Sequence, residues 1–549
     1  MKYFALTLAF LLASSTPLYS QTHSTGSHPA SETKEATLMT GLGSHHHPVS
    51  TANAEAQRFF DQGLTLVYAF NHEEAVRSFE RAASLDPQLA MAHWGIALAL
   101  GPNINLDVDP AREKAAYEAV RKALSISAKA PENERAYIEA LAKRYSIEPG
   151  VDLKRLAVDY KDAMGELSKR YPDDLDAATL YAESMMNLRP WQLWTKEGTP
   201  AEGTLEIVAV LESVLKRAPN HIGAIHYYIH TVEASPHPEK ALAYVARLPA
   251  QVPAAGHLVH MPAHIYMRTG DYEAAAQSNK EGAEADQAYI KARGAQGIYP
   301  LMYYNHNLHF LAAAHSMAGR FADALQAARQ LESNVSPYVK EMPMLESFMP
   351  TPSMILVRFR KWDDITKSSE PDRTMRIPNA LWHYARGMAY AATGNLERAE
   401  AELKIFTAAV QAIPAGTPYG LNTAGSVLPI GENVLRARIA LARNDKRTAI
   451  ELLRKAVAAE DALKYNEPSD WDYPVRESLG GALLLNGEAE AAEKVFRADL
   501  EKNPRNGRSL FGLAESLKAQ GKNYAARMVQ IEFESAWKNA DVKLRVEDL

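Results

Sequence analysis

Residues 56–87 read AQRFFDQGLTLVYAFNHEEAVRSFERAASLDP, and this stretch decides the fold. Apolar residues recur at spacings of three and four on both sides of a short polar turn, a pattern that predicts two amphipathic helices. Small residues, Gly63, Ala75 and Ala82, stand where the two helices must approach closely, and Pro87 ends the second helix. The stretch therefore encodes one helix pair.

The same pattern returns six more times, each copy with a glycine or an asparagine in the turn and an alanine five residues later. The copies are marked by Gly270 with Ala275, Gly319 with Ala324, Gly394 with Ala399, Asn444 with Ala449, Gly487 with Ala492 and Gly521 with Ala526. Weaker helical pairs fill the intervals. A single pair cannot bury its apolar face alone, so we expect successive pairs to stack around one continuous core.

This arrangement resembles the tetratricopeptide repeat, a unit of roughly 34 residues. The repeat has small residues at positions 8, 20 and 27, an aromatic residue at 24 and proline at 32; Gly63, Ala75, Phe79, Ala82 and Pro87 occupy those positions in order. The resemblance implies an all-α fold, a right-handed α-solenoid of stacked helix-turn-helix repeats. It also implies that positions 2, 5, 9 and 12 of each first helix face a concave groove, which binds a protein or peptide partner.

The patterns divide the chain into six segments. They are a signal peptide (1–20), a flexible lead-in (21–50), an N-terminal repeat solenoid with a histidine-rich groove (51–335), an irregular connection with a degenerate repeat (336–379), a C-terminal repeat array (380–540) and a tail (541–549). Lys2 precedes a short apolar run, which is the layout of a cleavable secretory signal. We therefore expect a periplasmic or secreted protein, cleaved near residue 20.

Composition excludes several classes of function. The chain has 549 residues, with 60 Lys and Arg against 66 Asp and Glu, so its net charge of −6 offers no phosphate-neutralising face and nucleic acid is not an expected partner. The absence of cysteine excludes disulfides, thiolate metal sites and cysteine nucleophiles. No apolar run approaches the roughly 20 residues that span a bilayer, so membrane insertion is not expected.

Histidines gather in the central repeats. Ten of the 18 lie between His221 and His315, where even spacing would place about three. In the repeat register, the groove-facing candidates are His226, His230 and Glu233 in one repeat, His257, His260 and His264 in the next, and His306 and His309 in the third. These eight side chains are predicted to converge on one concave strip.

The spacing of these residues suits metal binding. His226 with His230, and His260 with His264, are i, i+4 pairs that place two imidazoles about 6 Å apart on one helix face. Neighbouring helices pack about 8 to 10 Å apart, so a third ligand can come from the adjacent repeat. Imidazole suits zinc, copper, iron and nickel, and the set could hold one or two such ions. Glu233 could act as a ligand or as a base.

Three interpretations of the strip stay open: a metal site, a histidine-rich groove for an organic or acidic ligand, and unrelated histidines. The HExxH motif of zinc proteases is absent because Tyr227 follows His226, and no serine nucleophile constellation is visible, so no catalytic residue is assigned. The favoured hypothesis is an exported scaffold that binds a protein or peptide and carries a metal-binding histidine cluster. The alternative is a metal-dependent enzyme or metal carrier that uses the same histidines.

Histidines outside the strip are assigned to structural positions. His221 is predicted to cap a helix, and His315 and His383 to lie in the core. The run 45–47 falls in the lead-in and is expected to have no specific role.

Overall fold

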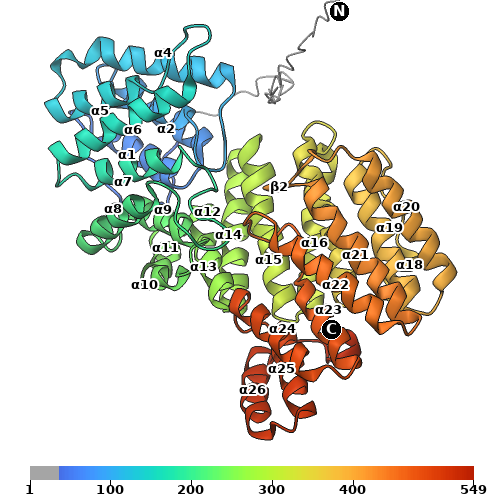
Figure 1. Ribbon diagram of the computed structural model, residues 1–549. Helices are drawn as coiled ribbons and strands as arrows, with labels where there is room; N and C mark the ends of the chain where they lie inside the picture. Colours follow the sequence, from blue (N-terminus) through green and yellow to red (C-terminus); the bar gives the residue numbers. More distant parts are fainter. Residues whose placement is uncertain (1–35) are drawn as a thin grey trace, which may run out of the picture. The chain divides into compact units, whose positions relative to one another are not determined.

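The computed structural model describes residues 36–549 (Figure 1). The predicted signal peptide and residues 21–35 of the lead-in lie outside the described residues. Within residues 36–549 the regular structure is almost entirely helical, as predicted; the strands are β1 (Pro418–Tyr419) and β2 (Asn422–Thr423), which pair antiparallel.

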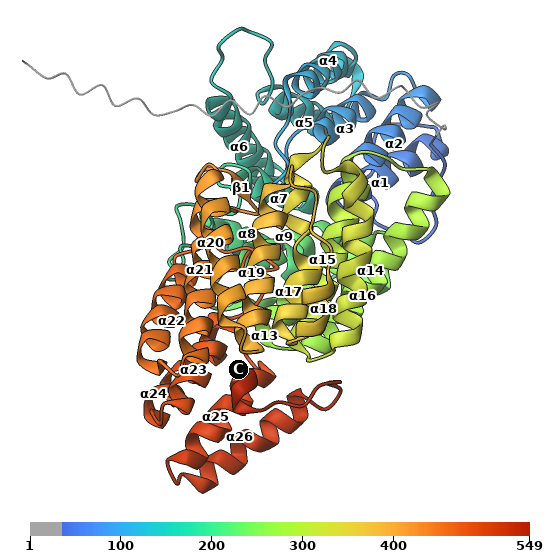
Figure 2. The same ribbon diagram turned by 90° about the vertical axis from the view of Figure 1, so that its right-hand side faces the viewer.

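The helices follow one another in pairs along the chain. The first part contains α1 (Ala54–Tyr68), α2 (His72–Leu85), α3 (Ala90–Leu100), α4 (Pro110–Ile126), η1 (Ser127–Lys129), α5 (Glu132–Ala142), α6 (Leu153–Arg170), α7 (Leu175–Met186), α8 (Thr204–Arg217) and α9 (Ile222–Val232). The middle contains η2 (Pro238–Ala241), α10 (Leu242–Val245), α11 (Arg247–Gln251), α12 (Gly256–His260), α13 (Pro262–Thr269), α14 (Tyr272–Arg293), η3 (Tyr299–Tyr303), α15 (Tyr304–Met317), α16 (Phe321–Val335), η4 (Ser336–Tyr338) and η5 (Pro343–Phe348). The last part contains α17 (Thr351–Arg358), α18 (Trp362–Lys367), α19 (Arg376–Ala392), α20 (Leu396–Ala412), α21 (Ala424–Ala442), α22 (Lys446–Asp461), α23 (Val475–Leu485), α24 (Ala489–Lys502), α25 (Gly507–Ala519), α26 (Asn523–Ala536) and η6 (Val546–Asp548). Figure 2 shows α19, α20, α21 and α22 lying side by side.

The turn between the two helices of a repeat explains the recurring glycine. The turn residues have positive φ, which glycine adopts without strain: Gly270 (79°), Gly319 (77°), Gly394 (82°), Gly487 (82°) and Gly521 (72°), with Asn444 (62°) in their place in one copy. The next residue is the N-cap of the second helix. In four copies it is an Asn or Asp whose side chain accepts a hydrogen bond from a backbone N–H of the first turn: Asn71, Asp271, Asn395 and Asp445.

Close approach between neighbouring pairs explains the small residues. A Cβ on Gly63 or Gly95 would lie 2.6 Å or 2.5 Å from the ring of Phe79, which inserts between α1 and α3. Phe496 fills the equivalent space between Gly480 and Gly512, with distances of 2.3 Å and 2.2 Å. The aromatic residue of one repeat therefore packs against the small residues of two successive first helices, and this contact propagates the stack.

The lead-in, expected to be flexible, and the C-terminal tail are both packed against the helices. Residues 36–50 lie against the first helices, with Leu42 and Val49 buried and His47 Nδ1 2.9 Å from Asp176 Oδ2. At the other end, Asp541 accepts hydrogen bonds from the backbone N–H groups of Phe321 and Ala322. The sequence could not show either contact, because each joins segments more than a hundred residues apart.

The C-terminal array folds back onto the central repeats. Tyr272 Oη donates to the carbonyl oxygen of Pro504 at 2.9 Å, and Arg268 Nη1 to that of Lys502 at 3.4 Å. Glu467, between α22 and α23, reaches His264 of α13 at 3.3 Å. A linear solenoid makes contacts only between adjacent repeats. These long-range contacts therefore cover part of the surface that the repeat pattern predicts to be an open groove. Among residues 36–549, no helix combines the length and the apolar character required to cross a bilayer.

Candidate metal centre

The predicted histidines do come together, but in the interior. His226, His230, His257, His260 and His264 are all buried, and His306 and His309 are partly buried. Five of the seven histidines that were predicted to line the groove are therefore shielded from solvent. The register placed them on one side correctly; Glu467 of the C-terminal part contacts His264, and Tyr68 and Phe70 contact His226.

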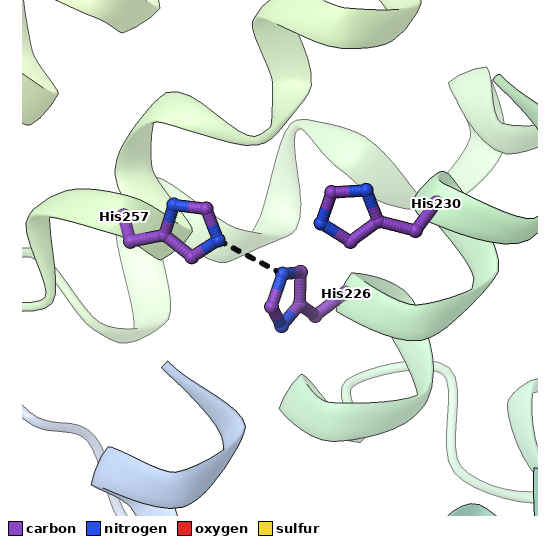
Figure 3. A group of neighbouring side chains, drawn as sticks. All are labelled: His226, His230 and His257. Atoms are coloured by element: carbon purple, nitrogen blue, oxygen red, sulfur yellow. Dashed lines mark hydrogen bonds between the residues drawn. The ribbon is translucent and has the colours of Figure 1, made fainter. Parts of the chain in front are cut away.

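The first triad consists of His226, His230 and His257. His226 and His230 come from α9, His257 comes from α12, and the three rings point toward a common centre (Figure 3). His226 Nε2 lies 3.1 Å from His257 Nε2, and one nitrogen of each residue lies within 4.8 Å of the other two. Metal–nitrogen bonds of about 2.0 Å in a tetrahedral site would place two ligand nitrogens about 3.3 Å apart. The triad thus has nearly the spacing of a ligand set.

The second triad consists of His260, His264 and His306. The predicted i, i+4 pair spans a helix break, because Pro262 begins α13 and His260 ends α12. The pair still forms, with the two Nε2 atoms 2.9 Å apart, and His306 of α15 completes a group within 4.8 Å. The two triads adjoin: the rings of His257 and His260 are 5.7 Å apart, and those of His230 and His264 are 5.4 Å apart.

Four of these six histidines have an acceptor on the outward-facing nitrogen. His226 Nδ1 donates to the carbonyl oxygen of Tyr68 at 2.6 Å, and His260 Nδ1 donates to Asn279 Oδ1 at 2.6 Å. His230 Nδ1 lies 2.9 Å from Glu233 Oε1, and His264 Nδ1 lies 2.5 Å from Glu233 Oε2. A proton on Nδ1 leaves a lone pair on Nε2 of the neutral ring. Histidines that bind metals are oriented in this way by outer acceptors.

The electrostatics of the site separate the histidines into two classes. Burial, reinforced by neighbouring imidazoles at most positions, lowers the pKa of His226, His230, His257, His260 and His306, which keeps them neutral. Burial also acts to lower the pKa of His264, but the carboxylates of Glu233 and Glu467 overcome it and raise the pKa. A proton or a metal ion on His264 Nε2 would relieve the repulsion between its lone pair and that of His260 Nε2, 2.9 Å away.

Two predicted members of the site lie outside the two triads. Glu233 follows α9 and bonds to one histidine of each triad, and it also forms a group with His264 and Glu467 that could hold a metal ion. His309 belongs to neither triad; its ring packs on Phe348 at 5.4 Å. On α15 the helical register turns His306 toward the triad and His309 away from it.

Glu467, Asn279 and the carbonyl of Tyr68 were missed by the sequence analysis. Glu467 lies some 200 positions from His264, in a connection without a repeat pattern, so no periodicity could have indicated it. The Tyr68 contact comes from the backbone, which carries no residue signature. Asn279, a polar residue on the buried face of α14, is the one signal that the sequence did contain.

A chamber of about 750 Å³ borders the first triad. Its wall includes His230 and Glu233, the loop with Trp191 and Trp194, and the connection with Tyr465. The ring of Trp191 meets that of His230 edge-on at 5.7 Å, and Trp194 Nε1 donates to the carbonyl oxygen of Thr231 at 2.6 Å. The volume lies in the range of small-molecule sites, about 300 to 1,000 Å³.

A second group of histidines surrounds Asp176. His45 and His221 approach Asp176 Oδ1 at 3.1 Å and 3.2 Å, and Tyr68 Oη donates to the same oxygen at 2.6 Å. His221 caps α9 as predicted, because its Nδ1 accepts from the N–H of Ala224. Its Nε2 therefore carries the proton and faces Asp176 Oδ1 at 3.2 Å. This group attaches residues 45–47 to α7 and α9, which corrects the expectation that they have no role.

Gly256 sets the position of α12, and replacing it by alanine is expected to disturb both triads. The new Cβ would meet Asp286 Oδ1 at 2.0 Å and the Gly282 carbonyl at 2.6 Å, and Asp286 is held by Tyr299 and Asn307. Displacing α12 moves one histidine of each triad, and overpacking of this kind costs about 1 to 3 kcal/mol. The free energy of unfolding, measured in urea, and the metal content should both fall. Gly416→Ala is the control, since nothing lies within 4 Å of that Cβ; equal behaviour of the two variants would contradict the argument.

No protein-family model matches the chain, and no curated protein matches it. Among solved structures, the human IFIT1 dimer with m7Gppp-AAAA is 14% identical, with a TM-score of 0.34, over 89% of this chain and 91% of that one. Cut9 in the APC/C hetero-tetramer Cut9–Hcn1 is 13% identical, with a TM-score of 0.31, over 90% and 75%. Yeast Tom70 is 12% identical, with a TM-score of 0.29, over 87% and 90%. Likenesses this distant carry no inference about what this chain binds.

Proposed function

We propose that this protein is a metal-dependent enzyme whose two adjacent histidine triads each hold one transition-metal ion. The observation that carries the proposal is the set of outer acceptors, which fixes Nδ1 of four histidines and leaves Nε2 free to bind an ion. Each triad supplies three protein ligands, the number found in catalytic zinc sites. The chamber beside His230 would admit a small substrate.

Metal content of the purified protein tests this proposal. Protein prepared without chelator, and apoprotein loaded separately with copper, zinc, iron or nickel, would be dialysed and analysed by mass spectrometry. We expect two equivalents of at least one metal to survive dialysis, because each triad is buried and complete. Turnover of small redox and hydrolytic substrates by the loaded protein and the apoprotein would then be compared. Retention of no metal from any of the four would overturn the proposal.

A second candidate function is binding of a peptide segment of a partner protein in the chamber, without chemistry. The mixed wall favours it: Trp191, Trp194 and Tyr465 stand beside Arg268 and Lys196, a combination suited to peptide side chains. This candidate predicts that the apoprotein and the loaded protein bind the same peptides from a defined library. A requirement for metal would favour the enzyme.

A further inference from the structure

One phenylalanine ring packs near all three histidines of each triad. Phe70 lies 4.5 Å from His226, 5.4 Å from His257 and 6.0 Å from His230, measured between ring centroids. Phe310 packs near the second triad in the same manner, at 5.0 Å from His260, 4.7 Å from His264 and 5.3 Å from His306. Both phenylalanines are themselves buried.

The residue type at position 70 departs from the repeat pattern. Phe70 occupies the turn position at which five other copies have glycine, and its φ is +55°. A bulky residue in the left-handed region is unfavourable, typically by an amount that the surrounding structure must offset. At this position the phenyl ring packs against the histidines of the first triad. Local strain of this kind concentrates at functional sites.

The charges near the triads are few. Glu233 and Glu467 are the carboxylates in contact with the ligand histidines. Arg268 lies 4.0 Å from Glu467, but 26% of its side chain is exposed, so water screens it. The cost of burying an ion grows with the square of its charge, so a divalent ion costs about four times as much as a monovalent one. The two carboxylates carry as much negative charge as two monovalent ions carry positive charge. With two divalent ions, the positive charge would exceed the negative charge of the carboxylates.

From these observations we infer that each triad is a three-coordinate site for copper(I), with a phenylalanine excluding the fourth ligand. This inference rests on the proposed function and names its metal. Copper(I) is monovalent, accepts three neutral nitrogen ligands and needs no bound water. Zinc, nickel and iron in the divalent state complete their shells with a fourth or further ligand, which the phenyl rings obstruct.

Competition titrations under anaerobic conditions test the inference. Apoprotein would be titrated with copper(I) against the chromophoric chelator bicinchoninate, and separately with zinc(II) against a zinc indicator. We expect two equivalents of copper(I), at least 100-fold tighter than zinc as an order of magnitude. X-ray absorption of the copper form should show three nitrogen neighbours. Zinc binding as tight as copper(I), or a fourth light-atom ligand on copper, would overturn the inference while leaving the proposed function intact. Binding of neither metal would overturn both.

Phe70→Gly isolates the role of the phenyl ring. Glycine adopts a positive φ without strain, so this substitution relieves the backbone strain and removes the phenyl ring from the first triad. We expect the preference of one site for copper(I) over zinc to fall about tenfold, the size of effect seen for residues outside the ligand shell. Asn444→Gly changes the equivalent, exposed turn position of a later repeat and should leave both titrations unchanged. An unaltered preference in Phe70→Gly would overturn the exclusion of a fourth ligand.

Discussion

Replacing His226 and His260 by alanine in one chain is expected to abolish metal retention, and either replacement alone to reduce it from two equivalents to one. Each residue supplies an Nε2 to a different triad, and each has its Nδ1 held by an outer acceptor. Two imidazoles in a buried site do not complete the three-ligand set. Mass spectrometry after dialysis gives the stoichiometry, and circular dichroism shows whether helix content is retained.

The matched control is His237→Ala. His237 lies in the same histidine-rich part of the sequence, but its side chain is 67% exposed and contacts Glu239 only through an exposed pair. The His237→Ala variant should retain two equivalents of metal. Because a buried histidine replaced by alanine leaves a cavity, His226→Asn and His260→Asn provide a second series that retains a polar side chain. Retention of two equivalents by folded double variants of both series would exclude the triads as ligands.

The largest effect on stability is expected from Glu477→Gln. Glu477 is buried and accepts hydrogen bonds from Arg358 at 3.0 Å and 3.1 Å, from Arg508 at 2.7 Å and from Asn506 at 2.9 Å. Glutamine preserves the volume but removes the charge, which leaves two buried guanidinium groups without compensation. Breaking a buried pair in this way costs about 3 to 5 kcal/mol. The free energy of unfolding from urea titration measures it.

The pH dependence of this difference has a definite sign. Burial raises the pKa of Glu477, but Arg358 and Arg508 outweigh it and hold the pKa below the ordinary value of a glutamate. A depressed pKa contributes stability that is complete above the unfolded-state value and is lost as the pH falls toward the folded-state value. The two proteins should therefore become more alike in acid. Glu118→Gln, in an exposed pair with Lys114, should behave as the unmodified protein does. A cost of under about 1 kcal/mol for Glu477→Gln at neutral pH would contradict this account.

The fold was predictable because its signals are local. The turn glycines, the alanines five residues later and the placement of Phe79 between Gly63 and Gly95 all follow from contacts within one repeat or between neighbours. The same register placed six triad histidines on one side of three successive repeats. Periodicity predicts these features because each depends on contacts within one repeat or between neighbouring repeats.

The parts that escaped prediction depend on contacts between distant segments. Nothing around residue 467 indicates that its carboxylate approaches His264, and nothing around residue 70 indicates that its ring packs against His226. The contact with His264 also depends on the return of the C-terminal array, which the repeat pattern alone does not encode. His309 was assigned to the site because the register places it beside His306. The two residues are three positions apart on α15, and the difference in direction around the helix is enough to place the His309 ring on Phe348.

The return of the chain onto its own middle changes how the protein should assemble. A strictly linear array can form or melt one unit at a time from either end. Here Tyr272 is tied to Pro504, and Phe321 to Asp541, so the central helices acquire their final contacts only when the last repeats are in place. Ion capture would then wait for the whole polypeptide: a nascent chain that ends before Glu467 contains every ligand histidine yet lacks the carboxylate that meets His264. Occupancy of the centre would thus report that synthesis and folding are both complete.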